Sequence, residues 1–179
     1  MPPSPPHRPG SLLSTGLMPV LGLGLVLVLW MFLGGPVRPA AASFADRVDY
    51  TLTNQSGQDF HGQQLAESSF AGALARDADF SGADLHGSIF TQGSFAKSNF
   101  SAADLSDVLM DRVDMGGTNL RGAILSRVIA SGSSFAGADI TDADFSEALL
   151  DRSDKVSLCR SASGRNPVTG VDTRESLEC

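Results

Sequence analysis

Residues 78–87 read Ala-Asp-Phe-Ser-Gly-Ala-Asp-Leu-His-Gly, which is one five-residue pattern written twice. Each copy has a small residue, an acidic residue, a large apolar residue, a polar residue and a glycine. The pattern returns at residues 118–122 as Thr-Asn-Leu-Arg-Gly. Its return in the same register indicates a chain built from five-residue repeats.

The large apolar position recurs without a break from residue 60 to residue 150. All nineteen positions are apolar in a chain that is 42% apolar, which random placement would produce less than about once in a million sequences. The position before it is Asp or Asn in nine repeats, and the position two after it is Gly in eight. The central residues are Phe60, Leu65, Phe70, Ala75, Phe80, Leu85, Phe90, Phe95, Phe100, Leu105, Met110, Met115, Leu120, Leu125, Ala130, Phe135, Ile140, Phe145 and Leu150.

A period of five fits neither an α-helix nor an alternating strand. A coil that turns a corner every five residues would point every fifth side chain inward. The sequence resembles the pentapeptide-repeat family, whose A-(D/N)-L-x-x motif it matches over residues 58–152. The resemblance implies an all-β fold, a right-handed quadrilateral β-helix with four repeats per coil. Nineteen repeats then make just under five coils, and a solenoid roughly 23 Å long at the usual strand spacing.

The segments outside the solenoid are assigned separate roles. Residues 43–57 are expected to form an N-terminal cap or linker, in which Tyr50 and its neighbours cover the first coil. Residues 153–179 follow the last repeat and contain the turn-like segment Asn-Pro-Val-Thr-Gly at 166–170.

The N-terminal 42 residues are typical of an export segment. Arg8 is followed by an almost wholly apolar stretch over residues 17–33 and by three alanines at 40–42. A basic start, an apolar middle and small residues at the end favour a signal peptide cleaved after residue 42. The apolar stretch is long for a signal and short for a membrane span, so an uncleaved membrane anchor over 17–33 stays open. Both readings place the rest of the chain across a membrane.

Both cysteines, Cys159 and Cys179, lie in the tail. An even cysteine count in an exported protein suggests a disulfide; two free thiols are the alternative. The cysteine-bounded tail resembles the C-terminal segment of pentapeptide-repeat proteins of the thylakoid lumen and their cyanobacterial relatives. That likeness implies a lumenal or periplasmic location, and family members there have no activity to carry over.

The sequence offers no catalytic, cofactor or metal motif. His61 and His86 follow central residues and should point outward, with no second metal ligand at a suitable spacing. Stacked coils would place Asp59, Asp79 and Asp139 in one column, where carboxylates could share calcium. Asp and Asn also stabilise turns by bonding to nearby backbone, which is the favoured interpretation. We therefore expect no enzyme, no cofactor and no metal.

One outward column differs from the others. Twenty-residue stacking aligns Ile89, Leu109, Ile129 and Leu149 at the position where other repeats prefer Asp or Asn. A contiguous apolar surface suggests a docking site. The alternative is that the chain's own tail or N-terminal segment covers it.

The predicted function is a non-catalytic extracytoplasmic scaffold or protein-binding module, in the thylakoid lumen or periplasm. The alternative is a purely structural rod that self-associates. From residue 43 onward the chain has 20 acids and 11 bases, since Arg8 and Arg38 precede it. This balance disfavours nucleic acid and anionic lipid, so we expect membrane contact only through an uncleaved N-terminal segment. Acidic pentapeptide-repeat proteins are also known as DNA mimics that protect gyrase, which is a remote alternative here because of the export segment.

Overall fold

The computed structural model describes residues 47–179. The predicted signal peptide or anchor, residues 1–42 with the apolar stretch 17–33, lies outside the described residues. Within the described part, none of the helices combines the length and apolar character needed to span a membrane.

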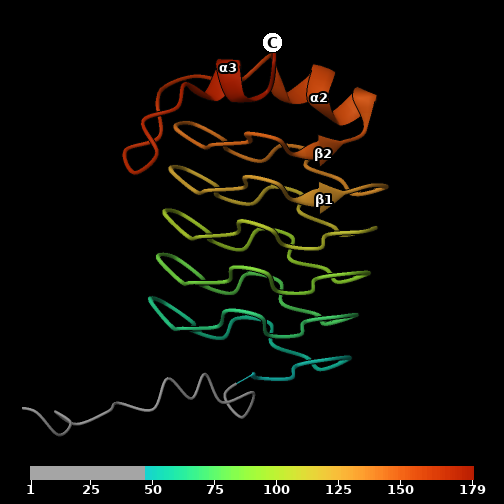
Figure 1. Cartoon of the computed structure of the whole chain (residues 1–179). Coiled ribbons are helices and arrows are strands. Elements are labelled where there is room, and N and C mark those ends of the chain that lie inside the picture. Colours follow the sequence, from blue (N-terminus) through green and yellow to red (C-terminus); the bar gives the residue numbers. More distant parts are fainter. Residues whose placement is uncertain (1–46) are drawn as a thin grey trace, which may run out of the picture. The chain divides into compact units, whose positions relative to one another are not determined.

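The described chain begins as a stack of coils with a period of twenty residues (Figure 1). Parallel bridges join each residue that precedes a central position to the residue twenty further on, from Asp49 with Ser69 to Ile124 with Asp144. One such contact, between Ile129 and Leu149, widens into the short strands β1 (Ile129–Ala130) and β2 (Leu149–Leu150), which pair in parallel. Four five-residue repeats therefore make one coil.

Backbone hydrogen bonds hold successive coils together. The Phe80 N–H donates to the carbonyl of Asn99 at 2.7 Å, and the Asn99 N–H donates to the carbonyl of Ala78 at 2.9 Å. The same two bonds recur along the stack. Because an unpaired buried backbone group is costly, this ladder lets the chain bury its interior without a conventional sheet.

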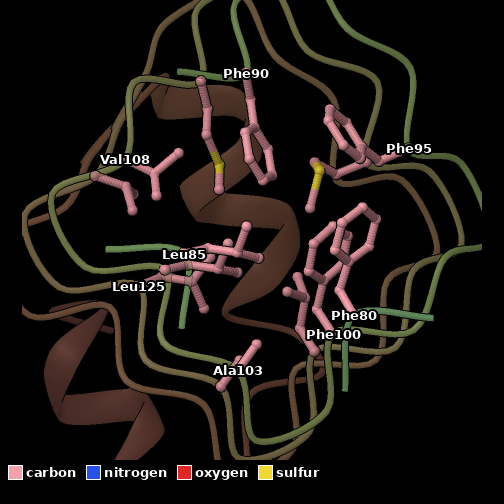
Figure 2. Packing of buried hydrophobic residues seen from close by; sticks show 14 of the residues in the cluster. Phe80, Leu85, Phe90, Phe95, Phe100, Ala103, Val108 and Leu125 are labelled. Atoms are coloured by element: carbon pink, nitrogen blue, oxygen red, sulfur yellow. The ribbon is translucent and has the colours of Figure 1, made fainter. Parts of the chain in front are cut away.

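The core is the ladder of central side chains, as the sequence predicts (Figure 2). Apart from half-buried Leu150, all nineteen central residues are buried. Phe60, Phe80 and Phe100 stack with ring centroids 4.7 and 4.8 Å apart. Stacking at the coil spacing therefore gives each ring an apolar neighbour in the adjacent coil.

The inward position two residues before each central residue must be small. At Gly93 a Cβ atom would lie 2.7 Å from Cε2 of Phe95 and 2.9 Å from the Phe90 carbonyl oxygen, so glycine leaves room for the rings. Ser88 is also fully buried, and its hydroxyl donates to the Leu65 carbonyl at 2.9 Å. At Ser88 the backbone thus satisfies the hydroxyl of an inward serine.

The corner position two after each central residue takes a left-handed backbone. Every such residue from 62 to 147 has a φ between about 56° and 71°, including Asp107 at 59° and Arg127 at 57°. A left-handed conformation costs a side-chain-bearing residue about 1–2 kcal/mol. This explains why glycine fills eight of these corners.

The stack begins earlier than the sequence suggested. The sequence predicts a cap or linker over residues 43–57, but Asp49 and Asn54 already bridge to the next coil. The Tyr50 ring stacks on Phe70 at 4.8 Å and meets Phe60 edge-on at 5.4 Å. Tyr50 therefore belongs to the core ladder, and the pentapeptide pattern includes it.

The C-terminal tail contains two short helices, which the five-residue pattern did not predict. Helix α2 spans Arg152–Leu158 and α3 spans Thr173–Ser176. Both lie across the end of the stack (Figure 1), and Leu158 and Leu177 join the buried core. The last coil has no further coil to pair with, and the helices cover its apolar interior.

A candidate docking surface on one face of the stack

Four apolar side chains form the apolar strip, defined as Ile89, Leu109, Ile129 and Leu149. Parallel bridges pair Ile89 with Leu109 and Leu109 with Ile129, and β1 pairs Ile129 with Leu149 in β2. Their exposed fractions are 42%, 37%, 42% and 61% in chain order. The described residues therefore leave the strip open, including the tail that could have covered it.

The position of these residues in the repeat determines that they face outward. Val108 and Met110, on either side of Leu109, are both buried with no exposed surface. A residue between two inward neighbours in extended backbone points to the opposite side. The strip is therefore set by the five-residue register and not by a local distortion.

In other columns, the residue just before the central residue stabilises the turn that follows. Asp79 Oδ1 accepts the backbone N–H of Ser81 at 2.9 Å, and Asp139 Oδ1 accepts that of Thr141 at 3.0 Å. In the strip's own column, Asp49 does the same for Thr51 at 2.9 Å. Isoleucine and leucine cannot accept this bond. In four successive coils the apolar strip therefore lacks the side-chain hydrogen bond that stabilises the turn elsewhere. The needs of the turn do not explain why apolar residues occupy these four positions.

Charged corners border the strip on both sides. On the side that precedes it, Arg127 Nε donates to Asp107 Oδ1 at 2.7 Å. The hydrogen bond from Arg127, together with its charge, lowers the pKa of Asp107. On the other side, an Arg112 nitrogen lies 3.6 Å from Asp111 Oδ2. An apolar centre with a charged border is typical of a protein interface.

The aspartate and asparagine column serves turn geometry and links the coils. Asn99 Nδ2 donates to Asp79 Oδ1 at 3.0 Å, and Asn119 Nδ2 donates to Asn99 Oδ1 at 3.0 Å. Within residues 47–179, no three His, Cys, Asp or Glu side chains are arranged to hold a metal ion. The side-chain oxygens of this column are thus occupied by hydrogen bonds.

One histidine has a serine and an aspartate beside it, an arrangement that the sequence did not suggest. His86 Nδ1 lies 3.0 Å from Ser106 Oγ and 3.5 Å from Asp107 Oδ2. A catalytic triad needs the serine and the carboxylate on opposite ring nitrogens, whereas both approach Nδ1 here. Ser106 Oγ also donates to Asp104 Oδ1 at 2.5 Å. This geometry does not activate the serine hydroxyl.

The tail is tied together at the end of the stack. The sulfurs of Cys159 and Cys179 lie at bonding distance, 2.09 Å. Arg174 Nη1 donates to the Cys159 carbonyl at 2.8 Å, and Lys155 Nζ pairs with Glu178. These contacts tie the C-terminal end of the tail to α2 and the residue that follows it.

Asn166 anchors the tail to the side of the stack, a role that the sequence did not reveal. It is 1% exposed. Its Nδ2 donates to the carbonyls of Gly122, Ala123 and Asp142 at 3.1, 3.2 and 3.1 Å. Its Oδ1 accepts the N–H groups of residues 168 and 169. The turn signal at 166–170 was visible in the sequence, but its docking partners more than twenty residues away were not.

Comparison with known proteins agrees with the repeat pattern. Residues 59–92, 94–127 and 125–154 match a family model described as pentapeptide repeats. The chain is 60% identical over 37 residues to the thylakoid lumenal protein TL20.3 of Arabidopsis thaliana. That alignment spans 21% of this chain and only 13% of the Arabidopsis protein.

A solved structure shares the fold. The crystal structure of a pentapeptide repeat protein from the Arabidopsis thaliana thylakoid lumen superposes with a TM-score of 0.71 and 35% identity. The match covers 73% of this chain and 90% of that one. The pentapeptide repeat protein Rfr23 of the cyanobacterium Cyanothece 51142 matches with a TM-score of 0.46 and 16% identity, over 57% of this chain and 80% of that one.

Proposed function

Because the chain belongs to the pentapeptide-repeat family, we propose that it is a non-catalytic protein-binding scaffold that works in the thylakoid lumen. The observation that carries this proposal is the apolar strip, Ile89, Leu109, Ile129 and Leu149, exposed by 37% to 61%. Exposed apolar patches of a few hundred Å² mark interaction sites on otherwise stable proteins.

The rest of the described chain supports a binding role over a catalytic one. The hydroxyl beside His86 is engaged by Asp104, and the Asp and Asn columns are engaged in turns. Family membership also supports a binding role, because the residues that define the repeat build the core and the turns of the stack. The solenoid then supplies a rigid, flat face whose one apolar column can pack against another protein.

The location follows from the relatives and from the tail. Two proteins similar to this chain are thylakoid lumenal. A disulfide between Cys159 and Cys179 suits an oxidising compartment outside the cytoplasm. A periplasmic location, and membrane anchoring through residues 17–33, are the alternatives that the sequence leaves open.

The proposal is tested by crosslinking and pull-down from membranes of the source organism. The bait is the wild-type chain, and its matched variants are Leu109→Ser with Ile129→Ser and, separately, Leu74→Ser. Leu74 is a suitable control because it occupies the same outward repeat position, is 49% exposed, and stacks between polar Asn54 and Ser94 on another face.

We expect specific crosslinked protein to be recovered by the wild type and by Leu74→Ser, and lost with the double strip variant. Equal recovery by all three baits would show that the strip is not the docking surface. Loss with both variants would indicate that any exposed leucine matters, and the strip would have no special role.

A further inference from the structure

The corner column that precedes the apolar strip carries charges in a particular order. Each corner residue lies two positions before a strip residue, so the column runs beside the strip from coil to coil. In chain order the column reads Gly87, Asp107, Arg127 and Glu147. The order is neutral, negative, positive, negative.

This order is self-complementary when two strips meet in antiparallel orientation. A two-fold axis between Leu109 and Ile129 sets Asp107 of each copy opposite Arg127 of the other. It also sets Glu147 opposite Gly87, so no like charges face each other. The same axis passes through the middle of the strip and pairs Leu109 with Ile129 of the second copy.

Other antiparallel registers are disfavoured by the same charges. An axis at Leu109 would set Asp107 against Asp107. An axis at Ile129 would set Arg127 against Arg127 and Asp107 against Glu147. Like charges placed directly opposite across an interface oppose association. The antiparallel register with its axis between Leu109 and Ile129 therefore both centres the apolar contact and avoids like charges at the corners.

The far border of the strip is compatible with this arrangement. There Asp111 and Arg112 of one copy would face Ser131 and Gly132 of the other. Gly132 has no side chain, and its N–H donates to Asp151 Oδ2 at 2.8 Å within the chain. This border therefore introduces no like-charge contact.

The ends of the stack do not compete with the strip for self-association. Helices α2 and α3 cover the C-terminal end (Figure 1). At the other end, three of the four inward positions of the first described coil hold the exposed polar residues Thr53, Gln58 and Gln63, and the fourth holds half-buried Val48. Polar side chains at these positions disfavour end-to-end stacking of apolar interiors. Among residues 47–179, the lateral strip is therefore the contiguous apolar column available to a second copy.

The size of the strip fits a weak dimer. Four side chains with these exposed fractions offer roughly 300 Å² of apolar surface. Stable dimers usually bury about 800 Å² from each partner, and the charged borders supply only part of the difference. The dimer should therefore dissociate on dilution.

We propose that the protein that docks on the apolar strip is a second copy of this chain, bound antiparallel with Asp107 of each copy facing Arg127 of the other. The inference rests on the proposed function, in which the strip is a protein-binding surface, and it names the occupant. Self-association through this face would make a two-fold symmetric scaffold with both C-terminal caps directed outward.

Sedimentation equilibrium of the full chain, purified from the compartment to which it is exported, tests the inference. The wild-type mass should rise with concentration from that of one chain toward that of two. Leu109→Ser with Ile129→Ser should weaken the dimer at least ~100-fold and remain at one chain's mass. Leu74→Ser should behave as the wild type.

Charge reversal tests the orientation. Asp107→Arg sets two positive corners against each other and should raise the dimer dissociation constant roughly tenfold. Adding Arg127→Asp restores opposite charges across the antiparallel axis and should recover the affinity. Arg121→Glu breaks an exposed contact to Asp139 on another face and should have no effect. A dimer that the double reversal does not restore, or that Asp107→Arg does not weaken, would refute the antiparallel arrangement.

The inference can fail separately from the proposed function. A wild-type chain that stays monomeric at every concentration overturns the inference. If such a chain still recovers a different protein in a strip-dependent way, the binding function stands. If the chain dimerises but the double strip variant dimerises equally well, both the inference and the strip's assignment as a docking surface are wrong.

Discussion

Replacement of Phe100 by alanine probes the ladder that holds the stack together. Phe100 has no exposed surface, and its ring stacks on Phe80 with centroids 4.8 Å apart and planes 2° from parallel. It also lies 5.9 Å from the Phe95 ring. Truncating a buried phenylalanine to alanine costs about 3–5 kcal/mol through lost burial and a residual cavity. Loss of the aromatic pair adds about 0.5–1.5 kcal/mol.

This loss is large relative to the total. Domains of this kind are stable by about 5–15 kcal/mol, so about a quarter or more of the free energy of unfolding should disappear. The midpoint of thermal unfolding should fall by roughly 10–20 °C. Urea unfolding followed by circular dichroism measures the free energy directly, and hydrogen exchange shows whether the coils next to Phe100 open first.

The matched control is Ser101→Asp, one residue away. Ser101 is half-buried at an outward turn, and the bond to Asn99 Oδ1 is made by its backbone N–H, which the substitution keeps. We expect a change of at most about 0.5 kcal/mol. Phe100→Asp should unfold the domain, because the charge would be buried without a partner. If Phe100→Asp and Ser101→Asp were equally stable, the inward assignment of the central residues would be wrong.

Three further changes probe the tail and the turns. Reduction of the Cys159–Cys179 disulfide reopens a loop of 20 residues, which should cost about 3 kcal/mol of tail stability in the chain-entropy model. Hydrogen exchange should then become faster in the tail and stay slow in the coils. Unfolding of the coils on reduction would contradict this expectation. Asn166→Ala leaves the Gly122 and Asp142 carbonyls without their side-chain donor, so the tail should be destabilised by about 1–3 kcal/mol, and unchanged exchange there would show that Asn166 is no anchor. The hydrogen bonds from Ser81 lower the pKa of Asp79, so its contribution to stability is present above the ordinary aspartate pKa of about 3.9 and is lost as the pH falls below that value. Melting between about pH 5 and about pH 2 should therefore fall less steeply in Asp79→Asn, and identical slopes would show that this carboxylate does not contribute.

The core of the fold could be predicted because the five-residue register is a property of the sequence alone. A side chain such as Phe100 is buried wherever its coil lies, since its neighbours in space are its neighbours at a fixed interval in sequence. The same register predicted that Leu109 and Ile129 stack and face outward. The register also extends back to Tyr50. The next central position holds the polar residue Gln55, so the run of apolar central residues did not reveal the first coil.

The tail could not be predicted in this way because it does not repeat. Helix α2 forms where the last coil needs a cover, and the buried Leu158 shows that tertiary packing decides the position. Asn166 is paired with carbonyls at Gly122 and Asp142, residues that no local pattern connects to it. The cysteine pair gave the one sequence signal that the tail folds back on itself.

The central claim is that the apolar strip is a surface for another protein and not part of the chain's own packing. Thermal unfolding of Leu109→Ser with Ile129→Ser, at a dilution where the wild-type chain is a single copy, tests this most directly. If the strip faces solvent in the single chain, the midpoint should stay within about 3 °C of the wild type, because surface substitutions cost little. A fall of about 10 °C or more would show that the chain's own segments cover the strip, and the docking surface would then be wrongly assigned.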